Sequence, residues 1–419
     1  MAQPPAGERA APNRSGLGRA LRRVRTLGAY ALGRAARRDS HRWVLGNLKG
    51  FRDDARYLAE HLAAARPDIE AWWIAGSADE ADAARAAGLR SAVRGEAAAT
   101  EAQRHARVAF IANGFGDLEP AHLGGAFVVD LRHGQGLKKV LLDMLPDPGA
   151  RLSPRRRLAV AARRWWIRRR LSRVDMIVAP GAWAKARFET AFGGSPSRIQ
   201  VLGMPRFDVL QGGVAYQRVS GGDYRAALGI GREQYLVVWL PTWREAGDSA
   251  WLPRLEHADV ERAAVRRDLV ILVKPHPFSD LDVYRQRLTD SPRVRLLTES
   301  ATDVNALLRE ADALVTDYSS AAFDYAILER PIHFLTPDLA AFTAGHPLYE
   351  PMEALTDGHQ HVAWSTLVDA LVSDDETGLA AARRILELSR TRSEPGSSQR
   401  IVDAVARAVG LSQPGSAAV

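Results

Sequence analysis

Two histidines follow apolar runs of this sequence, in positions suited to proton transfer or to stabilising charge. His133 comes after residues 127–131 and before Gly134, whose missing side chain lets a ligand approach the backbone closely. His276 follows residues 269–273 and lies between two prolines, which hold the backbone in an extended turn. Because imidazole titrates near neutral pH, either histidine can act as an acid or a base. The alternative for each is a surface turn that carries an incidental histidine.

Groups suited to binding phosphate lie at the ends of further apolar runs. The segment 316–320 has the sequence TDYSS and precedes a helical run, so Ser319 and Ser320 are placed at a helix N-terminus, where free N–H groups attract anions. Lys274 directly precedes the proline-flanked turn, and Arg244 can bind phosphate through two parallel N–H groups. The alternative for segment 316–320 is an ordinary capped helix with its aspartate in a turn. The residues alone leave both interpretations open.

The elements that must position these groups alternate along the chain between strand-like and helical runs. In the first half we expect strands at residues 42–48, 71–75, 108–112, 127–131, 176–179 and 199–202. In the second half we expect strands at residues 236–240, 269–273, 294–297, 313–316 and 332–335. Helical runs separate them, notably at residues 53–65, 78–87, 182–192, 304–310 and 321–328. The predicted fold class is α/β, with two Rossmann-like domains that face each other across a cleft and bind ligands beyond the carboxyl ends of their strands.

Composition predicts two domains with disordered ends. Residues 1–40 are basic and lack apolar periodicity, so we expect a disordered tail. The first domain then covers residues 41–210, a glycine-rich linker covers 211–222, and the second domain covers 223–410. We expect a second disordered tail at residues 411–419.

The composition of the 419 residues, with 46% hydrophobic and 25% charged, is that of a soluble globular protein. The chain has no cysteine, which excludes disulfides and thiolate metal sites and suits a reducing compartment. No apolar run approaches the roughly 18 residues of a membrane-spanning helix, and residues 27–33 are too short for a signal-peptide core. We discount the pair Asp280 and Asp282 as metal ligands because acidic loops are common, and we expect no metal site and no cofactor.

The net charge of +8 is concentrated in two segments, and the rest of the chain is acidic. Residues 1–40 hold nine Arg, and residues 151–173 hold ten Arg and no acidic residue. On a helix, Leu158 and Trp165 share one partly apolar face, and tryptophans among arginines suit an anionic membrane surface. We therefore expect peripheral membrane contact through Arg163, Arg164, Trp165, Trp166, Arg168 and Arg169. The alternative is a solvated helix whose two tryptophans pack in the core.

Five motifs occur in the same order as in the CDP-glycerol glycerophosphotransferase family, which this chain resembles over roughly residues 41–350. They are HG with LKK at 133–139, GxPRxD at 203–208, PTxR at 241–244, KPHP at 274–277 and TDYSS at 316–320. The segment 50–58 is also similar, but Asp54 stands where the family usually has Asn. After His133 and Gly134 the family commonly has Thr-Pro, whereas this chain has Gln135 and a glycine, so the resemblance does not identify the acceptor.

The resemblance implies a GT-B fold and a CDP-glycerol or CDP-ribitol donor held mainly by domain 223–410. A hydroxyl of a lipid-linked or saccharide acceptor, held by domain 41–210, would attack the β-phosphorus and release CMP. By resemblance His133 is the base or orients the nucleophile, and His276 stabilises charge on the transferred phosphate. Arg206 and Asp208 have structural or inter-domain roles. The residues expected to bind donor phosphate or nucleotide are Thr242, Arg244, Lys274, Thr316, Asp317, Ser319 and Ser320.

Two other functions remain as alternatives at this point. A GT-B glycosyltransferase that uses a nucleotide sugar would have the same fold and differ in its donor. A nucleic-acid-binding protein would explain the Arg runs but not the histidines at strand ends, so we expect no nucleic-acid partner. The preferred interpretation is a cytoplasmic enzyme attached to the inner face of the plasma membrane, which acts in cell-envelope polymer, teichoic acid or capsule synthesis.

Overall fold

The computed structural model describes residues 28, 30, 33–132, 134–147, 149–213, 224–298, 303–373 and 376–411. His133 lies outside these residues. Most of the expected linker at 211–222 and most of the expected tails at 1–40 and 411–419 also lie outside them.

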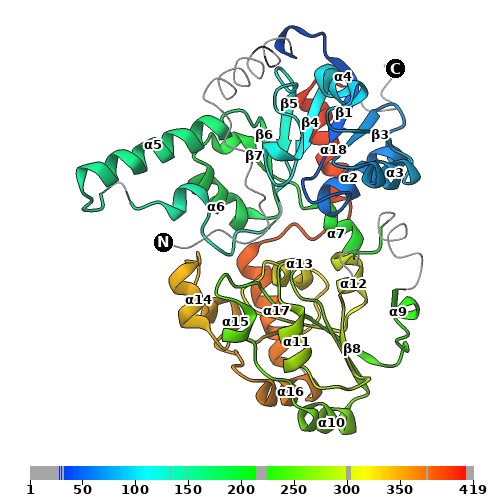
Figure 1. The fold of residues 1–419 in the computed structure, drawn as a ribbon, viewed down its shortest axis with the longest axis vertical. Coiled ribbons are helices and arrows are strands. Elements are labelled where there is room, and N and C mark those ends of the chain that lie inside the picture. Colours follow the sequence, from blue (N-terminus) through cyan, green and yellow to red (C-terminus); the bar gives the residue numbers. More distant parts are fainter. Residues whose placement is uncertain are drawn as a thin grey trace.

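The N-terminal domain is built on a seven-stranded parallel sheet in the order β3-β2-β1-β4-β5-β6-β7 (Figure 1). Its strands are β1 Asp39–Leu45, β2 Glu70–Ala75, β3 Arg90–Val93, β4 Ala106–Ile111, β5 Phe127–Asp130, β6 Met176–Ala179 and β7 Ile199–Val201. Its helices are α2 Asp53–Ala65, α3 Ala78–Ala86, α4 Ala97–His105, α5 Pro154–Leu171, α6 Ala182–Phe192 and α7 Pro205–Leu210, with 3-10 turns at Phe115–Asp117, Leu141–Met144 and Pro196–Arg198. Every residue of β6 is buried, as expected for a parallel strand covered on both faces.

The C-terminal domain contains a five-stranded parallel sheet in the order β10-β9-β8-β11-β12. Its strands are β8 Tyr235–Leu240, β9 Leu269–Val273, β10 Val294–Leu296, β11 Ala313–Thr316 and β12 Ile332–Phe334. Its helices are α9 Tyr224–Ala227, α10 His257–Arg266, α11 Leu281–Arg287, α12 Val304–Glu310, α13 Ala321–Ala326, α14 Leu339–Gly345, α15 Met352–Thr356, α16 Trp364–Val372 and α17 Glu376–Ser389, with a 3-10 turn at Asp248–Ala250. The predicted α/β class with two Rossmann-like domains is confirmed.

The strong apolar patterns fixed element positions well, and the weak ones did not. Helices α2 and α6 and strand β9 have the expected bounds. Strand β3 was not expected, because its four residues RSAV contain only two apolar side chains and lack a strand-length apolar run. It pairs with β2 at the edge of the sheet, so its position depends on a neighbour that is distant in the sequence.

The expected N-terminal tail, residues 1–40, extends too far along the chain, because its last residues belong to the N-terminal domain. Described residues 33–40 belong to the N-terminal domain, since β1 begins at Asp39. The guanidinium of Arg38 donates to the carbonyl oxygens of Gln103 at 2.9 Å and Ala106 at 2.8 Å. Basic composition suggested a solvated segment, whereas this arginine is bonded to the backbone of the domain.

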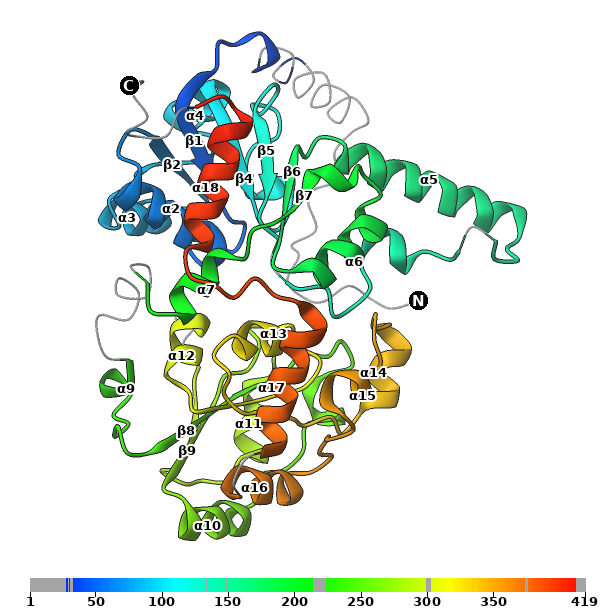
Figure 2. The ribbon, with the colours of Figure 1, turned by 180° about the vertical axis from the view of Figure 1, so that it is seen from behind.

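The expected boundary of the second domain at residue 410 is wrong for the last helix. Helix α18, Ser397–Ala408, crosses back and packs on α2 and α7 of the N-terminal domain (Figure 2). Asp208 fixes this return, because its carboxylate accepts from the backbone N–H groups of Ser397 at 2.9 Å and Ser398 at 2.8 Å. The sequence of α18 does not by itself indicate which domain the helix packs on.

A buried ionic network joins the two domains. The Arg206 guanidinium donates to Asp54 of α2 at 2.9 Å and to Asp324 of α13 at 2.9 Å. Gln135 is also buried, and its amide donates to Asp324 at 3.1 Å. Arg206 and Gln135 therefore both contact the C-terminal domain at this joint, whereas Asp208 holds the start of α18. Tyr57 adds a second link, since its hydroxyl donates to Asp303 at 2.8 Å.

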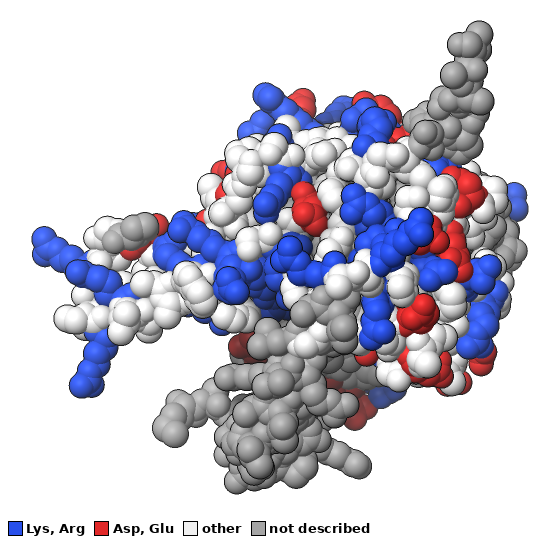
Figure 3. Space-filling model, turned by 90° about the horizontal axis from the view of Figure 1, so that it is seen from above, with Lys and Arg blue, Asp and Glu red and all other residues white. Residues whose placement is uncertain are grey.

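Helix α5 projects from the side of the N-terminal domain (Figures 1 and 2). Trp165 and Trp166 are 64% and 45% exposed, and Ile167 is its one buried residue, which rules out the alternative with both tryptophans in the core. Arg163 and Arg170 stack on Trp166, at 5.1 and 5.4 Å from the ring centroid. From above, basic side chains line the projecting arm (Figure 3). Within the described ranges, no helix combines the length and apolar character needed to cross a membrane.

Candidate active site

A cavity of about 1190 Å³ lies between the two domains, beyond the carboxyl ends of β1, β8 and β9. Its C-terminal wall carries three of the predicted residues, Lys274, His276 and Ser319. Its N-terminal wall is formed by the loop after β1 and by helices α2 and α3, and includes Lys49, Phe51, Arg52, Arg56 and Tyr57. The volume exceeds the ~300–1000 Å³ of common small-molecule sites, which leaves space for two substrates.

His276 follows β9 and faces this cavity. Its Nδ1 accepts from the backbone N–H of Phe278 at 3.3 Å, so the neutral ring carries its proton on Nε2 as a donor. The rings of Trp243 and Phe278 lie 6.3 and 5.2 Å from the imidazole, measured between centroids. Burial lowers the pKa of His276, and the positive charges of Lys49, Lys138 and Lys274 lower it further. Without a bound anion, the imidazole is therefore neutral at pH 7, and the nearest charges named above are those of lysines.

Lys274 is the first residue after β9, and its side chain lines the cavity although the residue is largely buried. Burial lowers the pKa of Lys274, and the charge of Arg52 on the opposite wall lowers it further. Among the described residues Lys274 forms no ion pair with a carboxylate. An anion between the walls would satisfy both cations.

Ser319 lines the cavity, and Ser320 lies close to Gly134 of the N-terminal domain. The Ser319 hydroxyl oxygen accepts from the backbone N–H of Ala321 at 3.2 Å, which leaves its proton free to donate. A side-chain carbon added at Gly134 would lie 3.3 Å from the Ser320 hydroxyl oxygen. The backbone at Gly134 therefore approaches Ser320, and His133 lies outside the described residues.

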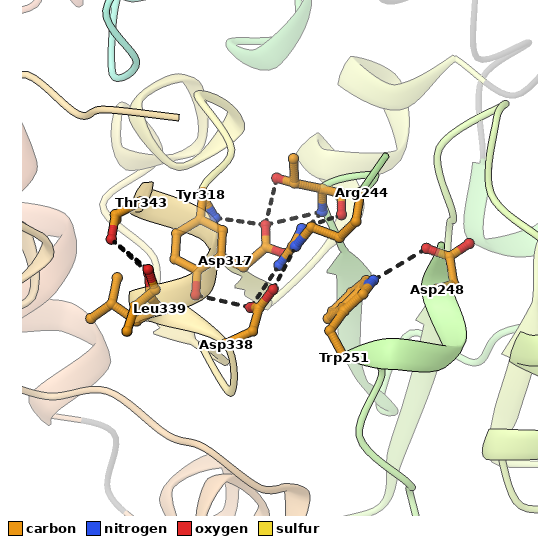
Figure 4. Close-up of polar contacts among 10 residues, drawn as sticks. Arg244, Asp248, Trp251, Asp317, Tyr318, Asp338, Leu339 and Thr343 are labelled. Carbon is orange, nitrogen blue, oxygen red and sulfur yellow. Dashed lines mark hydrogen bonds and ion pairs between the residues drawn. The ribbon is translucent and has the colours of Figure 1, made fainter. Parts of the chain in front are cut away.

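Arg244 does not line the cavity, and each of its three guanidinium nitrogens donates to a protein oxygen (Figure 4). It donates to Asp317 at 2.9 Å and to Asp338 at 2.9 and 3.1 Å, and also to the carbonyl of Thr242. Its charge lies over the rings of Trp251 and Phe342, at 4.0 and 4.7 Å from their centroids. In this structure the donors of the expected phosphate clamp bind carboxylates, so phosphate binding by Arg244 stays a prediction.

Asp317, Thr242 and Thr316, which we expect to bind donor phosphate or nucleotide, form hydrogen bonds within the C-terminal domain. The Asp317 carboxylate accepts from the Thr242 hydroxyl at 2.6 Å and from the Thr242 backbone N–H at 3.0 Å. The Thr316 hydroxyl donates to the carbonyl of Leu240 at 2.8 Å. These contacts tie the ends of β8 and β11 together and so hold the segment that carries Ser319. They place the three residues behind the cavity wall and not in it.

The sequence interpretation assigned no role to the cations of the N-terminal wall. Lys49 and Arg52 lie in the loop between β1 and α2. Lys138 is not part of the cavity lining and lies near Phe342, with Nζ 5.2 Å from the ring centroid. The available signal was a lysine, a glycine and an arginine within residues 49–52, in the loop after the first strand. Within the described ranges, no group of three or more histidine, aspartate or glutamate residues is arranged to hold a metal ion.

Comparison with known proteins gives consistent matches. A family model described as CDP-glycerol:poly(glycerophosphate) glycerophosphotransferase matches residues 31–407. The chain is 28% identical over 199 residues to the teichoic acid ribitol-phosphate polymerase TarL of Staphylococcus aureus, which covers 46% of this chain and 34% of that protein. It is 26% identical over 237 residues to a teichoic acid ribitol-phosphate primase of Bacillus spizizenii, covering 55% and 59%.

The chain thus spans between about a third and three fifths of the length of these relatives. Its fold is similar to that of the wall teichoic acid polymerase TagF, with a TM-score of 0.69 and 21% identity over 94% of this chain and 96% of that one. This likeness supports the two-domain architecture of the fold.

Proposed function

Because this chain belongs to the CDP-glycerol:poly(glycerophosphate) glycerophosphotransferase family, we propose that it transfers glycerol phosphate or ribitol phosphate from a CDP-polyol to an acceptor hydroxyl. The acceptor oxygen forms a bond to the β-phosphorus, the bond from that phosphorus to CMP breaks, and the hydroxyl loses its proton. The observation that carries the proposal is the convergence of Lys274, His276 and Ser319 on one inter-domain cavity.

The chemistry of the cavity suits phosphoryl transfer. Such a reaction depends mainly on positioning and on neutralising charge at the transferred phosphate. Lys274 supplies a cation, and His276 and Ser319 supply hydrogen-bond donors on the C-terminal wall. His133 is assigned as the base, or as the group that orients the nucleophile, on the resemblance of its motif alone. We propose the acceptor to be a lipid-linked or saccharide hydroxyl that enters along the N-terminal wall.

The decisive measurement is CMP release from CDP-glycerol and from CDP-ribitol, with a lipid-linked acceptor and with UDP-sugars as alternative donors. We expect turnover of at least one CDP-polyol and none of the UDP-sugars. Transfer from a UDP-sugar without turnover of either CDP-polyol would favour the glycosyltransferase alternative.

CDP binding is expected to raise the pKa of His276. In the free protein burial and three lysines lower this pKa, and two phosphates beside the ring would offset the lysine charges. Between the lowered pKa of the free protein and the raised pKa of the complex, binding takes up as much as one proton. CDP affinity therefore falls as pH rises through the pKa of the complex. Calorimetry in two buffers of different ionisation enthalpy measures this uptake, and His276→Gln should remove it. Equal uptake by both proteins would contradict the placement of the diphosphate beside His276.

We further propose that helix α5 attaches the enzyme to the inner, cytoplasmic face of the plasma membrane, where a lipid-linked acceptor is available. Its exposed Leu158, Trp165 and Trp166 provide apolar contact, and the arginines around them provide charge. Each arginine near an anionic leaflet contributes about 1 kcal/mol.

Reversing charge with Arg→Glu at Arg163, Arg164, Arg168 and Arg169 is expected to abolish sedimentation with vesicles that contain anionic lipid. Loss of the contacts that these four arginines make with the anionic leaflet should weaken vesicle binding by more than about a hundredfold. Neutral vesicles serve as the control. Unchanged binding to anionic vesicles, with an unchanged circular dichroism spectrum, would contradict attachment through α5.

A further inference from the structure

Asp53, the first residue of α2, has a backbone φ of 58°, in the left-handed region that residues other than glycine rarely adopt. Aspartate tolerates this region better than most residues, but such conformations cost free energy and cluster at functional sites. The other described residues that share a positive φ, glycines aside, do not line the inter-domain cavity: they are Arg132, Leu141, Glu329, Asp357 and Arg390. Among the described residues, Asp53 therefore combines a strained backbone with a place in the cavity lining.

Helix α2 holds Asp53 in place through buried contacts near its start. Asp54 accepts from the Arg206 guanidinium at 2.9 Å, and the Tyr57 hydroxyl donates to Asp303 at 2.8 Å. Both contacts join the first turns of α2 to residues that are distant in the sequence. Asp53 is therefore mounted on a rigid support, which is what a residue that orients a substrate requires.

The carboxylate of Asp53 is available to a ligand. Within the described ranges it accepts no hydrogen bond and forms no ion pair. The other acids of the cavity lining differ, because Glu60 pairs with Arg56 at 2.9 Å and Asp303 accepts a hydroxyl at 2.8 Å. An acidic residue in a first helical turn also stabilises the helix through its dipole. That effect does not require a left-handed backbone, and Asp54 of the same turn also supplies it.

The chemistry of a free carboxylate limits what Asp53 can bind. An ionised carboxylate only accepts hydrogen bonds, so its ligand must supply donors. Under the proposed function the phosphates of the CDP-polyol lie on Lys274, His276 and Ser319 of the C-terminal wall, and phosphates supply no donors. Hydroxyl groups do, and polyols and saccharides both carry them on adjacent carbons. Because Asp53 belongs to the N-terminal wall, we expect the hydroxyl that reaches it to come from the acceptor.

On the basis of the proposed function, we propose that Asp53 is a further substrate-binding residue, whose carboxylate accepts a hydrogen bond from the acceptor hydroxyl adjacent to the attacking one. The attacking hydroxyl itself stays free to lose its proton to the base. Holding the neighbouring hydroxyl fixes the attacking oxygen in line with the phosphorus and the leaving oxygen. The prediction applies to a polyol and to a saccharide acceptor alike.

The test uses Asp53→Gly, which removes the carboxylate, and Asp53→Asn, which keeps a neutral acceptor of the same shape. Both residues adopt a positive φ readily, so the melting temperature should stay close to that of the wild type. The matched control is Asp357→Gly, since Asp357 also has a left-handed backbone, with a φ of 51°, but is exposed and outside the cavity lining.

CMP release from the preferred CDP-polyol is measured with two synthetic acceptors on the same lipid carrier. One ends in a 2,3-dihydroxypropyl group, and the other ends in a 3-hydroxypropyl group that lacks the neighbouring hydroxyl. For Asp53→Gly we expect kcat/KM for the diol acceptor to fall at least about tenfold, as for loss of a hydrogen bond to a charged group. With the 3-hydroxypropyl acceptor it should change less than twofold. Asp53→Asn should lie between wild type and Asp53→Gly, and Asp357→Gly should match the wild type.

Three results would overturn the inference. They are unchanged kcat/KM of Asp53→Gly with the diol acceptor, equal losses with both acceptors, and a tenfold loss of CDP affinity, which would assign the carboxylate to the donor. Calorimetric titration of the CDP complex with each acceptor gives a readout that does not need turnover. Asp53→Gly should bind the diol acceptor at least tenfold more weakly than the wild type does, and equal binding would also contradict the inference. Absence of CMP release by the wild type would instead count against the proposed function.

Discussion

Replacing His276 by alanine is expected to lower kcat for CMP release by about 10²–10³-fold. The Nδ1 atom is held by the backbone N–H of Phe278, so Nε2 is the atom that presents a proton to the cavity. Its hydrogen bond strengthens as charge develops on the transferred phosphate, and this gain is lost in the variant. The effect should therefore appear mainly in kcat, with a smaller change in donor KM.

Two further variants separate this role from a structural one. His276→Gln retains a side-chain N–H and should recover part of the lost activity. His257→Ala is the matched control, since His257 lies on α10 with a side chain that is 65% exposed. The melting temperature of all three variants should stay close to that of the wild type, because His276 lies at the surface of the cavity. Activity of His276→Ala within twofold of wild type would refute its assigned role.

Replacing Arg206 by methionine is expected to destabilise the protein by about 3–5 kcal/mol. The substitution leaves the buried carboxylates of Asp54 and Asp324 without their cation, and removing one member of a buried ion pair is far more costly than removing both. Because Arg206 bonds to both domains, the loss should also weaken their joint. Urea denaturation followed by circular dichroism measures the change in stability.

An ion pair that is more exposed than that of Arg206 provides the control. Arg42 pairs with Glu70 at 2.7 Å, but both side chains are 23% exposed, so Arg42→Ala should cost at most about 1 kcal/mol. Adding Asp54→Asn to Arg206→Met should recover part of the loss, since the amide removes one uncompensated charge and keeps the shape. A loss for Arg206→Met no larger than for Arg42→Ala would show that the network contributes little to stability.

The departure from the family pattern at Gln135 has a structural explanation. The side chain is buried and donates to Asp324, which also accepts from Arg206. Its own oxygen accepts from the Thr391 hydroxyl at 3.4 Å. The residue therefore takes part in the domain joint, and its side chain does not line the cavity described here.

The sequence by itself determined where the helices and strands lie, and which strands are followed by polar residues that could act in catalysis or binding. Strong apolar runs such as β9 and β11, and periodic helices such as α2 and α6, have the expected positions because their patterns are local. The polar residues that follow parallel strands, including Lys274, His276 and Ser319, lie at one edge of the sheet for the same reason. The resemblance over five motifs gave the family.

Only the tertiary structure decided which charged groups are free to bind a ligand. Arg244 resembles a phosphate ligand in the sequence, yet it pairs with Asp338, which lies 94 residues away. Arg206, expected to be structural or inter-domain, pairs with Asp54, which lies 152 residues away. Lys49 and Arg52 gave no comparable signal, and among the described residues neither forms an ion pair. The sequence gives the type and charge of each side chain, but its hydrogen-bond and ion-pair partners depend on long-range packing. In a buried network, an arginine that pairs with carboxylates of the protein stabilises the fold, whereas one without such partners can bind a substrate.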